Sequence, residues 1–409
     1  MERYRLRPAL FALALLALSS LPPAAAAASF LQPDPTRTAP APGLPWITAQ
    51  WPVQVDADAV AVSQTTLTVT LPGQRGVTLQ RTGARQDAGP QTTWQGTVGT
   101  SAVAPAPAGT LQAALNSATL IRSGGHVIGM LRVQGQLYQL THLRGQPLLQ
   151  AINEAALPAA HQAGRAVPST GSLLQRAAAA GDITPADDTH ATVRVLVLGT
   201  RNAAAAHPDL AALARLGIAQ ANQTYANTGV ALSLELAGYV PLDYRESGFP
   251  DLDLNRIVAP HDGHEDGIHP RRDAVAADVV VLLTDTGQQG FCGRAAEIGA
   301  SAETAFAFVS WQCIGPDLSL AHEIGHLHGA LHEGTGGEPF PFGHGYQYQT
   351  AETTGWRTVM AYDCERPCPR LPYWSDPQRL LDGVPMGIEG QADNRRVLAL
   401  TKAWVAGFR

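Results

Sequence analysis

The sequence predicts two folded parts, a β-rich module followed by an α/β domain. Its 409 residues are more than one ordinary domain needs. Up to about Leu149, apolar and polar residues alternate in short runs separated by turn residues, a pattern typical of strands. Beyond residue 189, strand-like runs alternate with stretches of helical periodicity, which predicts an α/β arrangement. The hydrophobic content of 45% is enough to form both cores.

The first 28 residues are expected to be a secretory signal peptide. Three arginines form a basic start, Ala9 to Leu21 form an apolar run of about 13 residues, and small residues follow up to Ser29. The alternative, a membrane anchor, needs about 20 apolar residues. Pro22 and Pro23 interrupt the run before that length is reached. We therefore expect a secreted protein without a membrane partner.

Residues 29–158 are expected to form a β-rich propeptide. Thr66 to Leu71 alternate between polar and apolar residues, and glycines separate similar runs at 119–121, 126–131 and 136–140. Residues 159–188 show no sustained period and are interpreted as a linker that contains the maturation site. As an alternative, the β-rich part is a carbohydrate- or partner-binding module that remains after maturation.

Residues 189–409 are expected to form the catalytic domain. Strands are predicted at 192–198, 230–236, 279–283 and 305–309, and helices at about 208–226, 318–328 and 391–407. The run at 279–283 is apolar throughout, as in a strand covered on both faces.

The four cysteines all lie in this last part of the chain. An even number in an exported protein suggests two disulfides, for which three pairings exist. We favour Cys292–Cys313 and Cys364–Cys368 because these partners are nearest in sequence. A zinc site of four cysteines is the rival interpretation, but the paired short spacings of such sites are missing.

The segment that begins at position 322, His-Glu-Ile-Gly-His-Leu-His-Gly-Ala-Leu-His, predicts a metal site. On a helix, His322 and His326 lie one turn apart on the same face. Gly329 can take the left-handed conformation that ends a helix, so that His332 returns as a third ligand. Three histidines leave one position of a single Zn²⁺ open for water, which indicates catalysis rather than a closed structural site.

Glu323 is the expected catalytic base. It projects about 100° round the helix from His322, which puts its carboxylate beside the metal rather than on it. Zinc lowers the pKa of a bound water toward ~7, and a carboxylate can take the remaining proton as the oxygen attacks a peptide carbonyl. The predicted function is hydrolysis of polypeptides. The net charge of −6 gives no reason to expect nucleic acid or an anionic membrane as a partner.

The extended histidine motif, followed by Thr358-Val359-Met360-Ala361-Tyr362, resembles the metzincin metalloproteases with their methionine turn. The resemblance implies an α/β (α+β) catalytic domain with an active-site helix, and Met360 packed beneath the metal. It further implies that Tyr362 reaches the zinc or the oxyanion, whereas a core tyrosine is the alternative.

Residues 221–230, 368–377 and 392–396 make the chain similar to reprolysin-like enzymes, closest to bacterial peptidyl-Asp metalloendopeptidases. One departure is Glu333, where reprolysin-like enzymes usually carry Asp. The resemblance implies cleavage before Asp and a pocket wall at 364–374. Within it, Arg370 is our candidate for holding an acidic side chain through two hydrogen bonds. A surface arginine is the alternative.

Other features carry less weight. His261, His264 and His269 are expected in a solvated loop rather than at a second metal, His328 faces away from the zinc, and His344 is interpreted as structural. Nothing in the sequence indicates structural calcium, and we expect a monomer. The alternative function is an inactive secreted zinc-binding or adhesive protein on the same fold, but such proteins typically lose the glutamate, which is present here.

Overall fold

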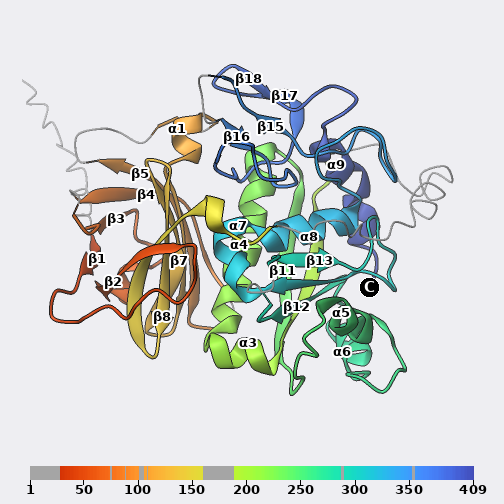
Figure 1. Cartoon of the computed structure of the whole chain (residues 1–409), viewed down its shortest axis with the longest axis horizontal. Helices are drawn as coiled ribbons and strands as arrows, with labels where there is room; N and C mark the ends of the chain where they lie inside the picture. The colour runs from red at the N-terminus through yellow and green to blue at the C-terminus, as the bar shows by residue number, and fades with distance from the viewer. Residues whose placement is uncertain are drawn as a thin grey trace, which may run out of the picture.

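The computed structural model describes residues 28–73, 76–87, 89–100, 106–107, 109–159, 188–286, 290–351 and 355–409. They form two adjoining bodies, a β-barrel and an α/β body (Figure 1). The expected signal peptide falls outside the described residues except for its last position, and the expected linker falls outside them between 160 and 187. In the part of the chain that is described, no helix has the length and apolar character needed to cross a bilayer.

The N-terminal body is a closed barrel with the strand order β1-β2-β9-β8-β7-β6-β5-β4-β3. Its strands are β1 (Ala28–Pro33), β2 (Ile47–Val55), β3 (Thr66–Val69), β4 (Val77–Gln86), β5 (Gln91–Thr100), β6 (Ser117–Ser123), β7 (His126–Val133), β8 (Gln136–Leu143) and β9 (Gln146–Ile152). The parallel pairing of β1 with β3 closes the barrel. Apolar side chains, among them the fully buried Trp94, fill its interior.

The C-terminal body is built on a five-stranded sheet with the order β11-β10-β12-β14-β13. Its strands are β10 (Ala191–Gly199), β11 (Leu232–Pro241), β12 (Val279–Thr284), β13 (Gly293–Ala295) and β14 (Phe306–Ser310). Four strands are parallel, whereas β13 runs antiparallel to β14 and forms an edge. Every residue of the central β12 is buried, which explains its uninterrupted apolar run.

Helices cover this sheet, and smaller elements complete the chain. The helices of the C-terminal body are α3 (Arg201–Ala206), α4 (Leu210–Thr228), α5 (Pro250–Val258), α6 (Ile268–Ala274), α7 (Ile314–Asp317), α8 (Ser319–His328) and α9 (Asn394–Val405). The short elements are η1 (Ala57–Ala59), α1 (Leu111–Ala114), η2 (Glu154–Ala156), η4 (Trp311–Cys313), β15 (Gln347–Tyr348), β16 (Trp356–Arg357), β17 (Asp376–Leu381) and β18 (Val384–Met386).

Helix α4 connects the other parts of the C-terminal body. The Asp209 side chain accepts a hydrogen bond from Ala212 N–H at its start, and Gly229 ends it with a φ of 73°. Gly217 lets α4 approach α7 and α8, because a Cβ there would lie 3.0 Å from atoms of Ile314 and Leu320. Helix α8 is therefore held between α4 and the sheet.

Most expected elements are present in the C-terminal body, with ends shifted by a few residues. The disulfides Cys292–Cys313 and Cys364–Cys368 confirm the favoured pairing. Helices α5 and α6 were not predicted, since each is short and interrupted by charged residues. His269 was expected in a loop and lies instead in α6, which corrects that expectation.

The two bodies share one apolar core. Ile121, Ile128 and Met130 of the barrel belong to the same buried cluster as residues of α4 and of the sheet. Gln95 Nε2 donates a hydrogen bond to the carbonyl of Ala219 in α4 at 3.2 Å. The barrel is therefore packed against the α/β body rather than tethered beside it.

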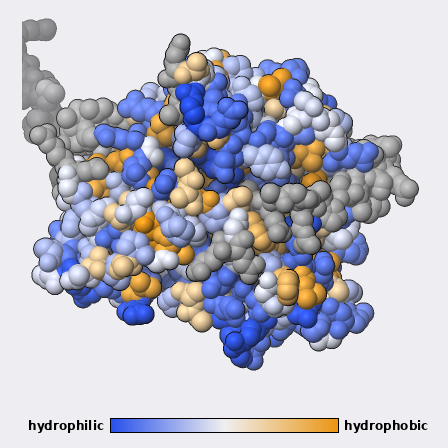
Figure 2. All heavy atoms as spheres, in the orientation of Figure 1, coloured by the Kyte–Doolittle hydropathy of each residue, from blue (hydrophilic) through white to orange (hydrophobic). Residues whose placement is uncertain are grey.

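On the outside of the molecule, hydrophilic residues cover most of the visible face, with apolar residues in small groups between them (Figure 2).

Gly129 offers a test of the packing between β6 and β7. A Cβ at this position would fall 2.3 Å from Thr119 O and 2.8 Å from Leu120 Cδ2. Gly129→Ala is expected to lower the free energy of unfolding by about 1–3 kcal/mol, the usual cost of overpacking. Gly43→Ala is the control, because nothing lies within 4 Å of its Cβ position. Equal urea midpoints for the two variants would contradict the predicted close approach.

Candidate active site

Three imidazoles meet at one point in the C-terminal body. His322 Nε2 and His326 Nε2 each lie 3.1 Å from His332 Nε2. Their ligand atoms lie within 4.8 Å of one another, close enough to hold one metal ion. Among the histidine, cysteine, aspartate and glutamate side chains that the structure describes, these three form the group that can do so. The three histidines singled out from the sequence are therefore brought together.

Backbone carbonyls orient the first two imidazoles. His322 Nδ1 donates to Val359 O at 2.9 Å, and His326 Nδ1 donates to Ala330 O at 2.8 Å. With a proton fixed on each Nδ1, the Nε2 lone pairs point toward the shared space. Helix α8 ends at Gly329, whose φ of 100° reverses the chain toward His332. His344 braces that return, with its Nδ1 2.6 Å from His332 O.

The turn that contains Met360 lies directly beneath α8. Met360 is fully buried. A Cβ added to Gly325 in α8 would lie 3.0 Å from Met360 Sδ, and a Cβ on Gly345 would lie 2.6 Å from Met360 C. Both glycines therefore allow the turn to press against the helix, and this contact places Val359 O where it meets His322.

Glu323 is fully buried and faces the sheet edge. Its carboxylate lies near the backbone of Ala295 in β13. A Cβ on Gly293 would lie 2.8 Å from Glu323 Oε1, so glycine there leaves room for the carboxylate. Burial raises the pKa of Glu323 well above its usual value, and the neighbouring backbone of Ala295 lowers it by less. A carboxyl with a raised pKa is a stronger proton acceptor.

Tyr362 lies at the mouth of the histidine cluster. Its ring centroid is 4.3 Å from that of His332, and 46% of the residue is exposed. Its backbone N–H donates to Glu333 Oε2 at 2.5 Å, and Gln347 Nε2 donates to Glu333 Oε1 at 2.7 Å. Glu333 thus ties the residue after the third histidine to the turn after Met360.

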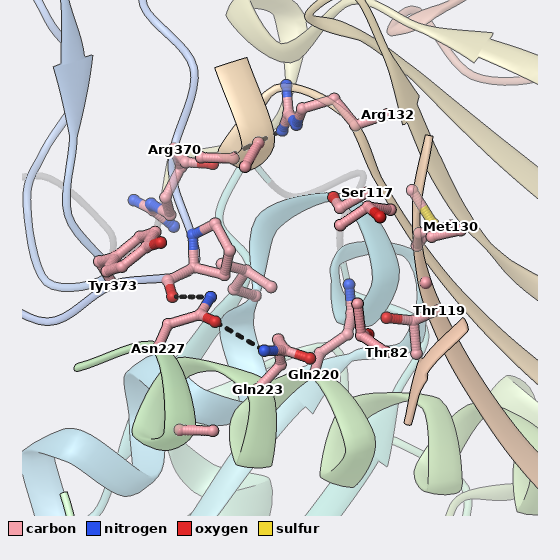
Figure 3. Close-up of a pocket in the computed structure, with 18 of the residues that line it drawn as sticks. Thr82, Ser117, Thr119, Met130, Arg132, Gln220, Gln223, Asn227, Arg370 and Tyr373 are labelled. Atoms are coloured by element: carbon pink, nitrogen blue, oxygen red, sulfur yellow. Dashed lines mark hydrogen bonds between the residues drawn. The ribbon is translucent and has the colours of Figure 1, made fainter. Parts of the chain in front are cut away.

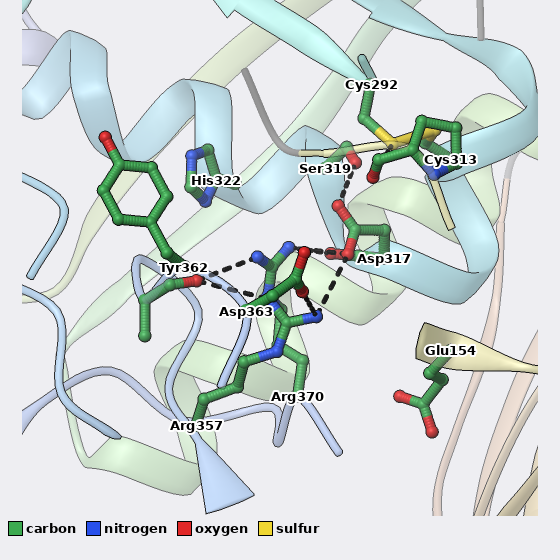
Figure 4. A network of polar contacts seen from close by, with 12 residues as sticks. Glu154, Cys292, Cys313, Asp317, Ser319, His322, Arg357, Tyr362, Asp363 and Arg370 are labelled. Carbon is green, nitrogen blue, oxygen red and sulfur yellow. Dashed lines mark hydrogen bonds and ion pairs between the residues drawn. A yellow bond between two sulfur atoms is a disulfide. The ribbon is translucent and has the colours of Figure 1, made fainter. Parts of the chain in front are cut away.

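Below this turn lies a cluster of charged side chains that sequence reasoning identified only in part (Figure 4). Arg370 Nη1 pairs with Asp317 Oδ1 at 2.8 Å, and both side chains are buried. Arg357 Nη2 lies 2.7 Å from Asp363 Oδ1. Burial, followed by the neighbouring Arg370, lowers the pKa of Arg357 to about 10. Arg370 is therefore already paired inside the protein, and Arg357 was missed because nothing in its sequence context marks it as buried.

The remaining histidines do not join the cluster. His261 and His264 are exposed, and no metal-binding group forms around them within the described residues. His328 Nδ1 lies 2.9 Å from Thr401 Oγ1 of α9, so it faces away from the other histidines as expected. Burial lowers the pKa of His328 to about 3 and keeps it neutral.

A separate cavity of about 430 Å³ lies between the two bodies (Figure 3). Gln220, Gln223 and Asn227 of α4 line it on one side, and Thr119 and Met130 of the barrel line it on the other. None of the three clustered histidines contributes to it. The cavity belongs to the interface between barrel and α/β body and not to the histidine site.

Residues 189–375 match the profile of metallopeptidase family M12. Peptidyl-Asp metalloendopeptidase of Stenotrophomonas maltophilia is 43% identical over 302 residues, which cover 72% of this chain and 71% of the relative. Its counterpart in Xanthomonas campestris is 40% identical over 370 residues, 87% of this chain and 85% of the relative. Metalloproteinase-II of Bacteroides fragilis, at 12% identity, overlaps 78% of this chain and 91% of its own with a TM-score of 0.42, too low to support an argument.

His332→Ala tests the third ligand. Because removal of a residue that merely supports a metal ligand costs about 10- to 100-fold in affinity, loss of a ligand itself should weaken zinc retention by more than about tenfold. Zinc per chain is measured by atomic emission after dialysis against a competing chelator. His261→Ala, which removes an exposed histidine, is expected to keep its zinc. Unchanged retention in His332→Ala would place the third ligand elsewhere.

Proposed function

The chain belongs to metallopeptidase family M12, and from this premise we propose that it is the secreted zymogen of a zinc endopeptidase that cleaves before Asp. It is a metalloendopeptidase, a hydrolase of peptide bonds that uses a catalytic metal. The observation that carries the proposal is the convergence of the His322, His326 and His332 Nε2 atoms.

The residues present fit a zinc ion. Three neutral imidazole nitrogens are a donor set that zinc favours, and they leave a coordination position open. The carbonyls of Val359 and Ala330 fix two of the rings in the required tautomer. We propose His322, His326 and His332 as the ligands. When bound, zinc supplies a Lewis acid that polarises a peptide carbonyl and acidifies a water molecule.

Glu323 is proposed as the catalytic base. Its buried carboxylate accepts a proton from the attacking water and then delivers it to the leaving amine. Tyr362, half-exposed beside His332, is proposed to donate a hydrogen bond to the developing oxyanion. The alternative is an inactive binding protein. Such a protein would have no need of a glutamate next to the ligand histidines, whereas Glu323 is present there and buried.

The β-barrel is proposed to be a propeptide, residues 29–158, joined through 159–188 to a catalytic domain, residues 189–409. Where the chain leaves the barrel, Ala159 O accepts a hydrogen bond from Cys292 N–H at 2.8 Å, next to the edge strand β13. That edge faces Glu323. We propose that the propeptide inhibits the enzyme by occupying this edge. Inhibition by a thiolate bound to the zinc would need a free cysteine, and the described residues contain none. Export rests on the expected signal peptide, residues 1–28.

The expectation that the protein acts on polypeptides agrees with its family, and cleavage before Asp is proposed from the name of its relatives. Monomeric state and lack of nucleic acid partners stay predictions.

Glu323→Gln tests the catalytic base. The amide cannot accept a proton, so peptide hydrolysis is expected to fall by at least about 10²–10⁴-fold, while zinc content stays at one ion per chain. Hydrolysis is followed with a quenched fluorescent peptide and zinc by atomic emission. The control is Glu389→Gln, an exposed glutamate. Activity of Glu323→Gln within about threefold of the wild type would refute this role.

Maturation gives an independent test. N-terminal sequencing of the secreted active protein is expected to find a start between residues 159 and 188. Since both disulfides use all four cysteines, a mercurial without proteolysis is expected to leave the purified precursor inactive. An active protein that begins at the barrel would show that the barrel is a permanent module.

A further inference from the structure

We infer that Arg357 binds the acidic side chain that follows the scissile bond, and that Asp363 occupies its guanidinium when substrate is absent. The inference rests on the proposed function, because it explains the proposed cleavage before Asp. It assigns the acid-binding role to a residue other than Arg370, the candidate suggested by the sequence.

Arg357 and Asp363 flank the turn that touches the metal ligands. Val359 O accepts the hydrogen bond from His322 Nδ1 at 2.9 Å, and the Tyr362 ring lies 4.3 Å from that of His332. In Figure 4 the Tyr362 ring lies beside His322, and Asp363 and Arg357 lie below them. The ion pair is thus attached to the turn that orients one metal ligand and carries Tyr362.

Of the two carboxylates near Arg357, the closer one is exposed. The buried carboxylate of Asp317 lies 2.8 Å from Arg370 but 4.0 Å from Arg357. Arg357, with only 4% of its side chain exposed, is paired instead with Asp363, whose side chain is 63% exposed. When Asp363 moves away, the carboxylate that remains near Arg357 is Asp317 at 4.0 Å, which Arg370 holds more closely at 2.8 Å. A second carboxylate in the place of Asp363 is therefore favourable.

Asp363 can give up this place, and a substrate carboxylate can take it. An exposed carboxylate that swings away is solvated by water, so its departure costs little. Arg357 Nη1 donates to Ala361 O at 3.3 Å, which fixes the plane of the guanidinium. Arg357 Nε is buried and has no acceptor among the described residues. A carboxylate approaching the Nε and Nη2 edge can thus form two parallel hydrogen bonds, where Asp363 forms one.

A neutral side chain cannot replace Asp363 in this way. If Asn or Leu displaced it, the buried guanidinium would keep only the carboxylate of Asp317 at 4.0 Å, and the loss of the closer partner selects against such substrates. Two other arginines near this turn are less suited to bind a substrate carboxylate. Arg370 already pairs with Asp317, and Arg366 is exposed and donates to Ala351 O at 3.0 Å. Selectivity thus comes from the Arg357 guanidinium, which an uncharged substrate side chain would leave without its close carboxylate partner.

The test uses mature zinc-loaded enzyme and three peptides that differ only in the residue after the scissile bond, Asp, Asn or Leu. The measured quantity is kcat/KM for each peptide. In Arg357→Gln the ratio of Asp to Asn is expected to fall by about 10- to 100-fold, the worth of hydrogen bonds to a charged group. In Arg271→Gln, which removes an exposed arginine of α6, the ratio is expected to stay at the wild-type value. An unchanged ratio in Arg357→Gln would overturn the inference.

Asp363→Asn gives an answer even if Arg357→Gln fails to fold, which thermal melting would reveal. Loss of the internal competitor is expected to lower KM for the Asp peptide by about two- to fivefold, the worth of a partly exposed ion pair. A higher KM for that peptide would mean that Asp363 supports the turn instead, and would overturn the inference. If the wild type cleaves all three peptides equally, the inference and the Asp preference fail while the endopeptidase function stands. If it cleaves none, the proposed function fails as well.

Discussion

Two hydrogen bonds from imidazole Nδ1 atoms to backbone carbonyls set the geometry on which the C-terminal body depends. Ala330 O belongs to the turn that ends α8, and Val359 O belongs to a turn 37 residues after His322. The second bond forms only because Met360 lies against the helix, where Gly325 and Gly345 leave space for it. The packing of a distant turn, rather than the helix alone, thus determines where the histidine lone pairs point.

The charged cluster under that turn serves geometry more than stability. Buried ion pairs gain little over apolar packing of equal volume. Asp317, however, lies two residues before Ser319, the first residue of α8. Its partner Arg370 also donates to Ala361 O at 2.9 Å. One pair therefore links the start of the histidine helix to the turn after Met360. From the barrel, Arg132 reaches Arg370 O at 3.5 Å, so the same cluster also contacts the N-terminal body.

Sequence reasoning identified the local features and missed the long-range ones. The histidine spacing, Gly329 and the buried run of β12 follow from periodicity and backbone conformation, which are local. The disulfides were inferred because partners close in sequence are favoured. The burial of Arg357 could not be predicted, since its environment is made by Asp317 and Asp363 from separate segments. Closure of the barrel was equally hidden, because strand pairing between β1 and β3 leaves no signal in composition.

The strand order of the barrel has a consequence for the order of synthesis. All of its described strands lie between Ala28 and Ile152, and β9 pairs with β2 and β8. The barrel can thus be complete as soon as Ile152 has emerged, before any strand of the second sheet exists. Its outer residues Ile121, Ile128 and Met130, which later share a core with α4, then form a ready apolar surface. Helix α4 can then pack against this surface as soon as it forms.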